Sequence, residues 1–106
     1  NRDHVDDSML KDVDRFIEEF KRNHSFELRI RKPAKVALVK LAAQENRSVL
    51  AFCERKFADF QHGLSIIEQR TGKKSFVIER KAIDDPDKEL SKWVVDSFGK
   101  KRDQGE

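Results

Sequence analysis

The spacing of apolar residues in the first third of the chain predicts a helix followed by a short strand. Apolar side chains recur at steps of three and four residues over residues 8–22, which is the period of one helix face. They are Met9, Leu10, Val13, Phe16, Ile17 and Phe20. Over residues 25–31 the period falls to two, because Phe26, Leu28 and Ile30 alternate with charged residues. A strand with one buried face is therefore expected after the first helix.

Residues 34–62 contain neither proline nor glycine and are helical in pattern throughout. Polar residues 44–48 divide this segment, and either Asn46 or Ser48 is suited to cap a third helix. Gly63 is expected to end that helix in the left-handed conformation. A single continuous helix over residues 34–62 is the alternative.

Two apolar runs separated by a glycine-containing loop follow, in the sequence LSIIEQRTGKKSFVIERK. This pattern predicts a β-hairpin over residues 65–81, with strands near 65–69 and 75–81. All the charges of the connecting loop are positive, so the tip of the hairpin is expected to be basic.

A final helix is expected to begin at Asp85, which is suited to cap it, and to end at Gly99. Together the elements predict an α+β fold with the order α-β-α-α-β-β-α, in which the last helix is an addition to a smaller core. We expect one compact domain over residues 8–99, since 106 residues fit a single domain. Residues 1–7 and 100–106 are expected to be disordered ends.

The composition excludes several classes of protein. No apolar run approaches the roughly 18–20 residues that would cross a membrane, and the acidic N-terminal segment is not a secretory signal. The single cysteine excludes an internal disulfide and is compatible with a reducing compartment, so an intracellular protein, nuclear or cytoplasmic, is expected. Because the chain starts without Met, we expect it to be an excised domain of a larger protein.

Charge is unevenly distributed along the chain. Residues 1–19 hold seven acids and three bases, a net charge of −4, whereas the remainder holds 20 bases and 13 acids, a net charge of +7. This asymmetry favours an acidic partner for the later part of the domain. A merely solubilised, charge-rich surface is the alternative.

Two groups of cations are candidates for contact with a phosphate backbone. The first group follows the third helix and the hairpin, and consists of Arg47, Arg55, Lys56, Arg70, Lys73, Lys74, Arg80 and Lys81. The second surrounds the first strand, and consists of Arg29, Arg31, Lys32 and Lys35. Nucleic acid is the better hypothesis if the two groups share one face, and a solvated surface is the better one if they lie on opposite faces.

The order of elements over residues 9–81 resembles that of the winged-helix family, a helix-turn-helix followed by a β-hairpin wing. In this resemblance the recognition helix is SVLAFCERKFADFQH and the wing is SIIEQRTGKKSFVIERK. It implies binding of duplex DNA, with the helix in the major groove and the wing on the backbone, although other members bind RNA or proteins. The segments VDRFIEEF and KSFVIERK also resemble parts of a single-strand-binding domain named for an Arg-x-x-x-His motif, but that motif is missing here.

Little in the sequence favours catalysis. The three histidines, His4, His24 and His62, are scattered, and Cys53 lies on the apolar side of a predicted helix, where a buried structural thiol is expected. The Thr71-Gly72-Lys73-Lys74 segment lacks the spacing of a phosphate-binding loop, and no residues have the spacing of a zinc site. We therefore expect neither an enzyme nor a cofactor.

The sequence thus predicts a non-catalytic nucleic-acid-binding module that contacts phosphates through the hairpin and the preceding helix. Every phenylalanine and Trp93 fall on apolar stripes, which favours backbone contact over stacking of bases. The alternative is a protein-interaction domain that uses the acidic first helix or the helix of Trp93. The choice between DNA and RNA, the sequence preference and the oligomeric state stay open.

Overall fold

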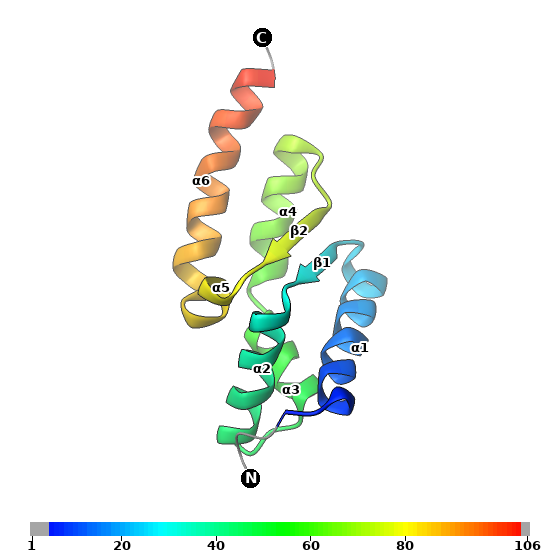
Figure 1. The fold of residues 1–106 in the computed structure, drawn as a ribbon. Coiled ribbons are helices and arrows are strands. Elements are labelled where there is room, and N and C mark those ends of the chain that lie inside the picture. The colour runs from blue at the N-terminus through cyan, green and yellow to red at the C-terminus, as the bar shows by residue number, and fades with distance from the viewer. Residues whose placement is uncertain (1–4, 105–106) are drawn as a thin grey trace.

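The computed structural model describes residues 5–104, and it describes the side chains of residues 5–98. The fold is a small α+β domain that is mostly helical, as Figure 1 shows. In chain order the elements are α1 (Asp7–His24), β1 (Glu27–Ile30), α2 (Lys32–Gln44), α3 (Val49–Lys56), α4 (Phe60–Thr71), β2 (Ser75–Ile78), α5 (Arg80–Asp84) and α6 (Pro86–Gln104). None of the described helices is long and apolar enough to cross a membrane. The predicted disordered ends lie in part outside the described residues. Of the described part, Asp6 caps α1, Asp7 begins it, and residues 100–104 belong to α6.

The two strands form a parallel pair in which Glu27 lies opposite Ser75 and Ile30 lies opposite Ile78. Backbone hydrogen bonds extend the pairing at both ends. The Glu27 N–H donates to the Lys74 carbonyl at 2.8 Å, and the Arg31 N–H donates to the Ile78 carbonyl at 2.9 Å. Parallel strands need a long crossover connection, and here α2, α3 and α4 provide it.

The predicted hairpin is wrong, because its first strand is helical. Residues 65–69 belong to α4, whose buried positions Phe60, Leu64 and Ile67 have the spacing of a helix face. The second predicted strand exists as β2, but it pairs with β1, and the residues that follow it form α5. A short apolar run does not by itself distinguish a strand from a buried stretch of helix.

Both glycines that were expected to end helices lie inside them. Gly63 lies within α4 where α6 packs against it, and a Cβ atom at Gly63 would lie 2.7 Å from Cδ2 of Leu90. The missing side chain therefore allows the two helices to approach closely. Helix α6 continues through Gly99 to Gln104.

The predicted break after α2 is confirmed, and the continuous helix is excluded. The Ser48 hydroxyl caps α3 by accepting a hydrogen bond from the Ala51 N–H at 3.1 Å, while Asn46 adopts a left-handed conformation with φ of 56°. A second break at residues 57–59 separates α3 from α4, so the predicted third helix is divided in two.

The core is rich in phenylalanine, as the apolar stripes predicted. The rings of Phe16 and Phe57 stack at 5.4 Å between centroids, and Phe57 packs edge-on against Phe60 at 5.0 Å. Cys53 is fully buried among these side chains. Burial, with a smaller contribution from the Glu54 carboxylate, raises the pKa of the Cys53 thiol from 9.0 to about 12.

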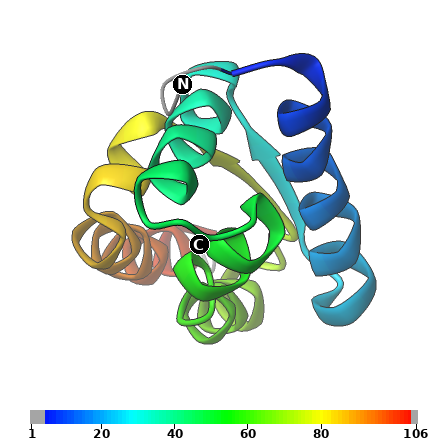
Figure 2. The same ribbon diagram turned by 90° about the horizontal axis from the view of Figure 1, so that it is seen from below.

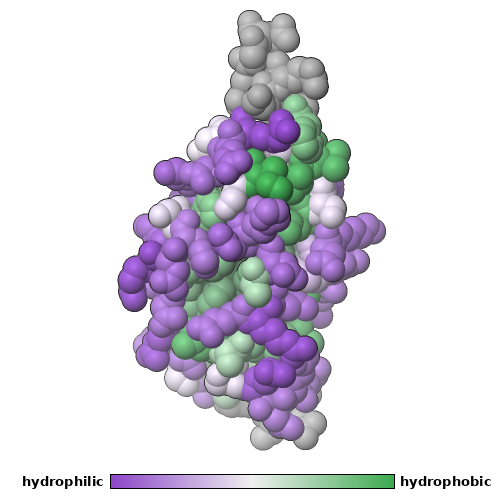
Figure 3. Space-filling model, turned by 180° about the vertical axis from the view of Figure 1, so that it is seen from behind, coloured by the Kyte–Doolittle hydropathy of each residue, from purple (hydrophilic) through white to green (hydrophobic). Residues whose placement is uncertain are grey.

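In the view from below, α1 and α6 lie on opposite sides of the molecule, with α2, α3 and α4 between them (Figure 2). Polar side chains cover most of the face seen from behind (Figure 3). On that face apolar side chains gather at the upper right of the view (Figure 3). Among the exposed apolar side chains, Val95 and Phe98 of α6 are 66% and 41% exposed.

Candidate nucleic-acid interface

The two-stranded sheet has one buried face and one open face. Leu28 and Ile30 of β1, with Phe76 and Ile78 of β2, point into the core. Because side chains alternate along a strand, the intervening residues point the other way. Arg29 and Val77, which lie opposite each other in the register, are both exposed there.

The parallel pairing brings cations from both predicted groups to the open face and the two ends of one small sheet. Arg31 directly follows β1, and its N–H donates to the Ile78 carbonyl, so it and Lys32 lie at the same end of the pair as Arg80, the first residue of α5. Lys73 and Lys74 precede β2, at the other end of the pair. At about 3.3 Å per residue, the chain from 73 to 80 extends over roughly 20 Å. We call the exposed cations along it the sheet strip: Arg29, Arg31, Lys32, Lys73, Lys74 and Arg80.

Three cations of the sheet strip have carboxylate partners. Arg29 lies 3.7 Å from Glu27, Lys74 lies 3.5 Å from Glu68, and Arg80 lies 3.8 Å from Asp84. The three cations are solvent-exposed, and such pairs contribute only about 0–1 kcal/mol, so a phosphate can compete for them. The other three cations, Arg31, Lys32 and Lys73, make no ion pair with any described residue.

Two of the predicted binding residues instead join elements of the fold. Lys35 Nζ donates to Asp14 Oδ1 at 2.7 Å and so links α2 to α1. Lys81 lies 3.7 Å from Glu89, whose side chain is largely buried, and this pair links α5 to α6. We therefore leave Lys35 and Lys81 out of the sheet strip.

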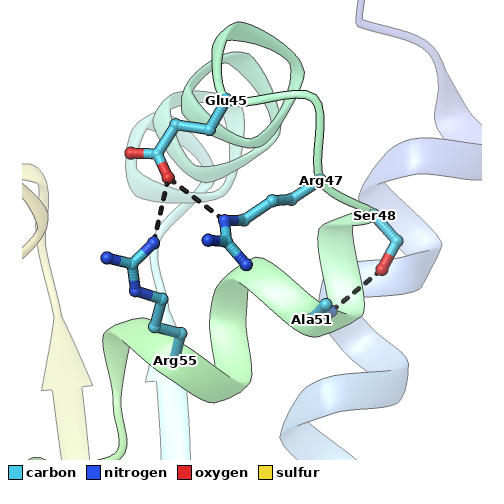
Figure 4. Close-up of polar contacts among 5 residues, drawn as sticks. All are labelled: Glu45, Arg47, Ser48, Ala51 and Arg55. Carbon is cyan, nitrogen blue, oxygen red and sulfur yellow. Dashed lines mark hydrogen bonds and ion pairs between the residues drawn. The ribbon is translucent and has the colours of Figure 1, made fainter.

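The cations predicted on the third helix gather at Glu45, beyond the C-terminal end of α2, whereas the sheet strip lies at the N-terminal end of that 13-residue helix. Figure 4 shows the Glu45 carboxylate between the guanidinium groups of Arg47 and Arg55. Arg47 Nε and Arg55 Nη1 each lie 3.4 Å from Glu45 Oε1. Lys56 borders a hollow that Glu45, Arg55, Asp59 and Asp87 also line. The hollow is therefore lined by three carboxylates and only two cations, Arg55 and Lys56, which makes it unfavourable for a polyanion.

Arg70 is held at the end of α4 by an aromatic ring. Its guanidinium carbon lies 3.7 Å from the centroid of the Phe98 ring, a cation–π contact that joins α4 to α6. Lys73 makes a longer contact of the same kind, with its ammonium 5.5 Å from the centroid of the Phe76 ring. Arg70 therefore lies near the sheet strip with its side chain already engaged.

A cavity of about 380 Å³ adjoins the sheet strip between α4, β2 and α6. Phe76, Val77 and Trp93 supply much of its apolar lining, and Lys73 and Asp96 supply its charges. Sequence reasoning missed this site because it assigned Trp93 wholly to the core. Trp93 is only half-buried, and the helical spacing of its stripe does not reveal the gap beside β2.

The described residues offer no arrangement suited to a metal. No three histidine, cysteine, aspartate or glutamate side chains in that part of the chain lie close enough together to hold one. The raised pKa of Cys53 keeps the buried thiol protonated at neutral pH, where it is a poor nucleophile.

Comparison with known proteins indicates no family or function for this chain. No family model, no curated protein and no solved structure matches this chain. The winged-helix resemblance therefore stays a prediction, and the hairpin that would have been its wing is replaced by α4, a loop and β2.

Proposed function

We propose that this domain is a non-catalytic nucleic-acid-binding module of an intracellular protein, and that it holds phosphates along the sheet strip. One observation carries the proposal: the parallel pairing of β1 and β2 gathers cations from two distant parts of the sequence around one small sheet. A row of cations that extends over roughly 20 Å suits a polyanion better than a single small anion.

Along the sheet strip, the proposed contact is with phosphates rather than with base edges. At the centre of the open sheet face the register pairs Arg29 with Val77, and the two aromatic residues of this region, Phe26 before β1 and Phe76 within β2, are buried. Stacking of successive bases on the sheet would need exposed aromatic rings, which the described side chains of this face do not provide. Affinity should therefore depend strongly on salt and weakly on sequence.

A salt titration with matched variants tests the proposal. Arg31→Gln with Lys32→Gln removes two unpaired cations from the sheet strip, whereas Arg55→Gln with Lys56→Gln removes the same charges from α3. Each lost phosphate contact reduces the slope of log affinity against log salt by about 0.9. The strip variant should therefore lose about 2 units of slope, and roughly 10- to 100-fold in affinity at low salt. The α3 variant should bind like the parent.

Fluorescence anisotropy with labelled duplex and single-stranded DNA and RNA provides the measurement, and thermal unfolding confirms that both variants stay folded. Equal weakening in the two variants would show that net charge alone determines binding. Unchanged binding in the strip variant would remove the sheet strip from the account.

A protein-binding surface on α6 is the second candidate function, favoured by the exposed apolar side chains Val95 and Phe98. Such a surface would bind its partner in a salt-insensitive way, because apolar contacts are not screened. Val95→Glu should then abolish capture of that partner while leaving any oligonucleotide affinity intact.

A further inference from the structure

The cavity beside β2 has the size and lining of a site for one small planar ligand. Its volume of about 380 Å³ is at the lower end of the roughly 300–1,000 Å³ typical of small-molecule sites. The rings of Phe76 and Trp93, which both line it, are nearly parallel, with an angle of 17° and 6.3 Å between centroids. The two rings stack on each other and so form one aromatic side of the cavity, which favours a flat ring as occupant.

The polar groups of the cavity divide into those that are satisfied and those that are free. Ser97 and Thr71 donate their hydroxyl hydrogens to the carbonyls of their own helices, at 2.6 and 2.8 Å. Neither Lys73 nor Asp96 forms an ion pair with a described residue. The indole N–H of Trp93 donates no hydrogen bond there either, and it is not sealed from solvent. A ligand would therefore meet a carboxylate without an ion pair, an N–H donor open to solvent, and the Lys73 ammonium, whose one described side-chain contact is the long cation–π contact with Phe76.

These free groups match the two ends of a nucleotide. A carboxylate accepts a hydrogen bond from the exocyclic amino group of a base, as Asp and Glu do with cytosine. An ammonium group is a strong partner for a phosphate. Lys73 lies at the boundary of the cavity and the sheet strip, so a strand that follows the strip would pass the cavity opening.

We propose that the cavity takes the amino-bearing base of an unpaired nucleotide, with Asp96 accepting from the amino group and Lys73 facing the phosphate. As a feature of strand binding, this inference rests on the proposed function. The same chemistry would also bind a free mononucleotide, so the experiment has to separate the two sources. Uracil and thymine lack the amino group, and we expect them to bind about tenfold or more weakly.

Trp93 is the only tryptophan of the chain, which contains no tyrosine, so its fluorescence reports on this cavity alone. The whole chain is titrated with cytidine monophosphate, uridine monophosphate, a short oligocytidine and a blunt duplex, with excitation at the red edge of the indole band. A saturable change with cytidine monophosphate that is about tenfold weaker with uridine monophosphate supports binding of the free nucleotide. A change with the oligocytidine alone supports binding of an unpaired position in a strand.

Variants on the same helix provide the control. Asp96→Asn should remove most of the preference for cytidine over uridine, whereas Asp87→Asn, which borders a different hollow, should leave it intact. Equal binding of the two monophosphates by the parent protein would overturn recognition of the amino group.

The result also distinguishes this inference from the proposed function. If single strands bind with the predicted salt dependence while the Trp93 emission stays constant, the cavity is excluded and the sheet strip stands. If cytidine monophosphate changes the emission while no strand binds, the sheet strip is excluded and the cavity stands as a nucleotide site.

Discussion

The packing of α4 against α6 at Gly63 leads to a quantitative prediction about stability. In the interior of an exposed helix, replacing glycine by alanine stabilises a protein by about 0.5–1 kcal/mol. Here the new Cβ would lie 2.7 Å from Cδ2 and 2.8 Å from Cδ1 of Leu90. Overpacking of that kind costs about 1–3 kcal/mol. The net effect of Gly63→Ala is then a destabilisation of about 0–2.5 kcal/mol, and we expect the lower half of that range because Leu90 is half-buried and its side chain can move.

A double-mutant cycle isolates the cause. Leu90→Ala removes the three atoms that the new Cβ would meet, so Gly63→Ala in that background should stabilise the protein by about 0.5–1 kcal/mol. Urea unfolding followed by circular dichroism measures all four proteins. Equal stabilisation in both backgrounds would show that α6 does not cross α4 here. Equal destabilisation in both backgrounds would instead indicate that Gly63 needs a left-handed conformation at the end of a helix, as the sequence pattern predicted.

Two further predictions concern α3. Ser48→Ala removes the cap on the Ala51 N–H and should lower the free energy of unfolding by about 1 kcal/mol, a drop of roughly 4–8 °C in Tm, while Ser48→Asp should retain most of the stability. Cys53, with its pKa raised to about 12, should react with a thiol reagent at pH 8 about 1,000-fold more slowly than in denaturant. Because the unfolded thiol ionises first, stability should fall as the pH rises from 9 towards 12, and Cys53→Ala should abolish that part of the pH dependence.

Sequence reasoning was most successful where a pattern was long and its boundaries had a chemical signal. The helix of residues 8–22 and the strand that contains Leu28 were found because their periods differ clearly. The cap at Ser48 was one of two candidates, and the structure selects it.

The errors arose where local pattern could not reveal a distant contact. The role of Gly63 depends on Leu90, which lies far along the chain, and no local signal distinguishes such a glycine from a helix end. The partner of β2 is β1, across the whole crossover, whereas the run at residues 65–69 is nearer in sequence. Adjacent apolar runs commonly pair as hairpins, so the sequence pattern predicts pairing of β2 with the nearer run.

The same limit applies to the candidate site. The cations were visible in the sequence, but their grouping depends on the parallel register that places Arg31 beside Ile78. Arg47 and Arg55 resembled recognition-helix residues until the structure brought Glu45 between them. The cavity at Trp93 requires the packing of three elements that are separate in sequence.

The most direct test of the central proposal is a map of backbone amide chemical shifts during titration of the labelled protein with a short oligonucleotide. Binding along the sheet strip predicts shifts that concentrate at residues 29–32, 73–75 and 79–80, with α3 and the acidic surface of α1 unchanged. Shifts that concentrate on α3 would contradict the proposal. The absence of shifts at an oligonucleotide concentration of about 1 mM, above typical non-specific dissociation constants, would also contradict it.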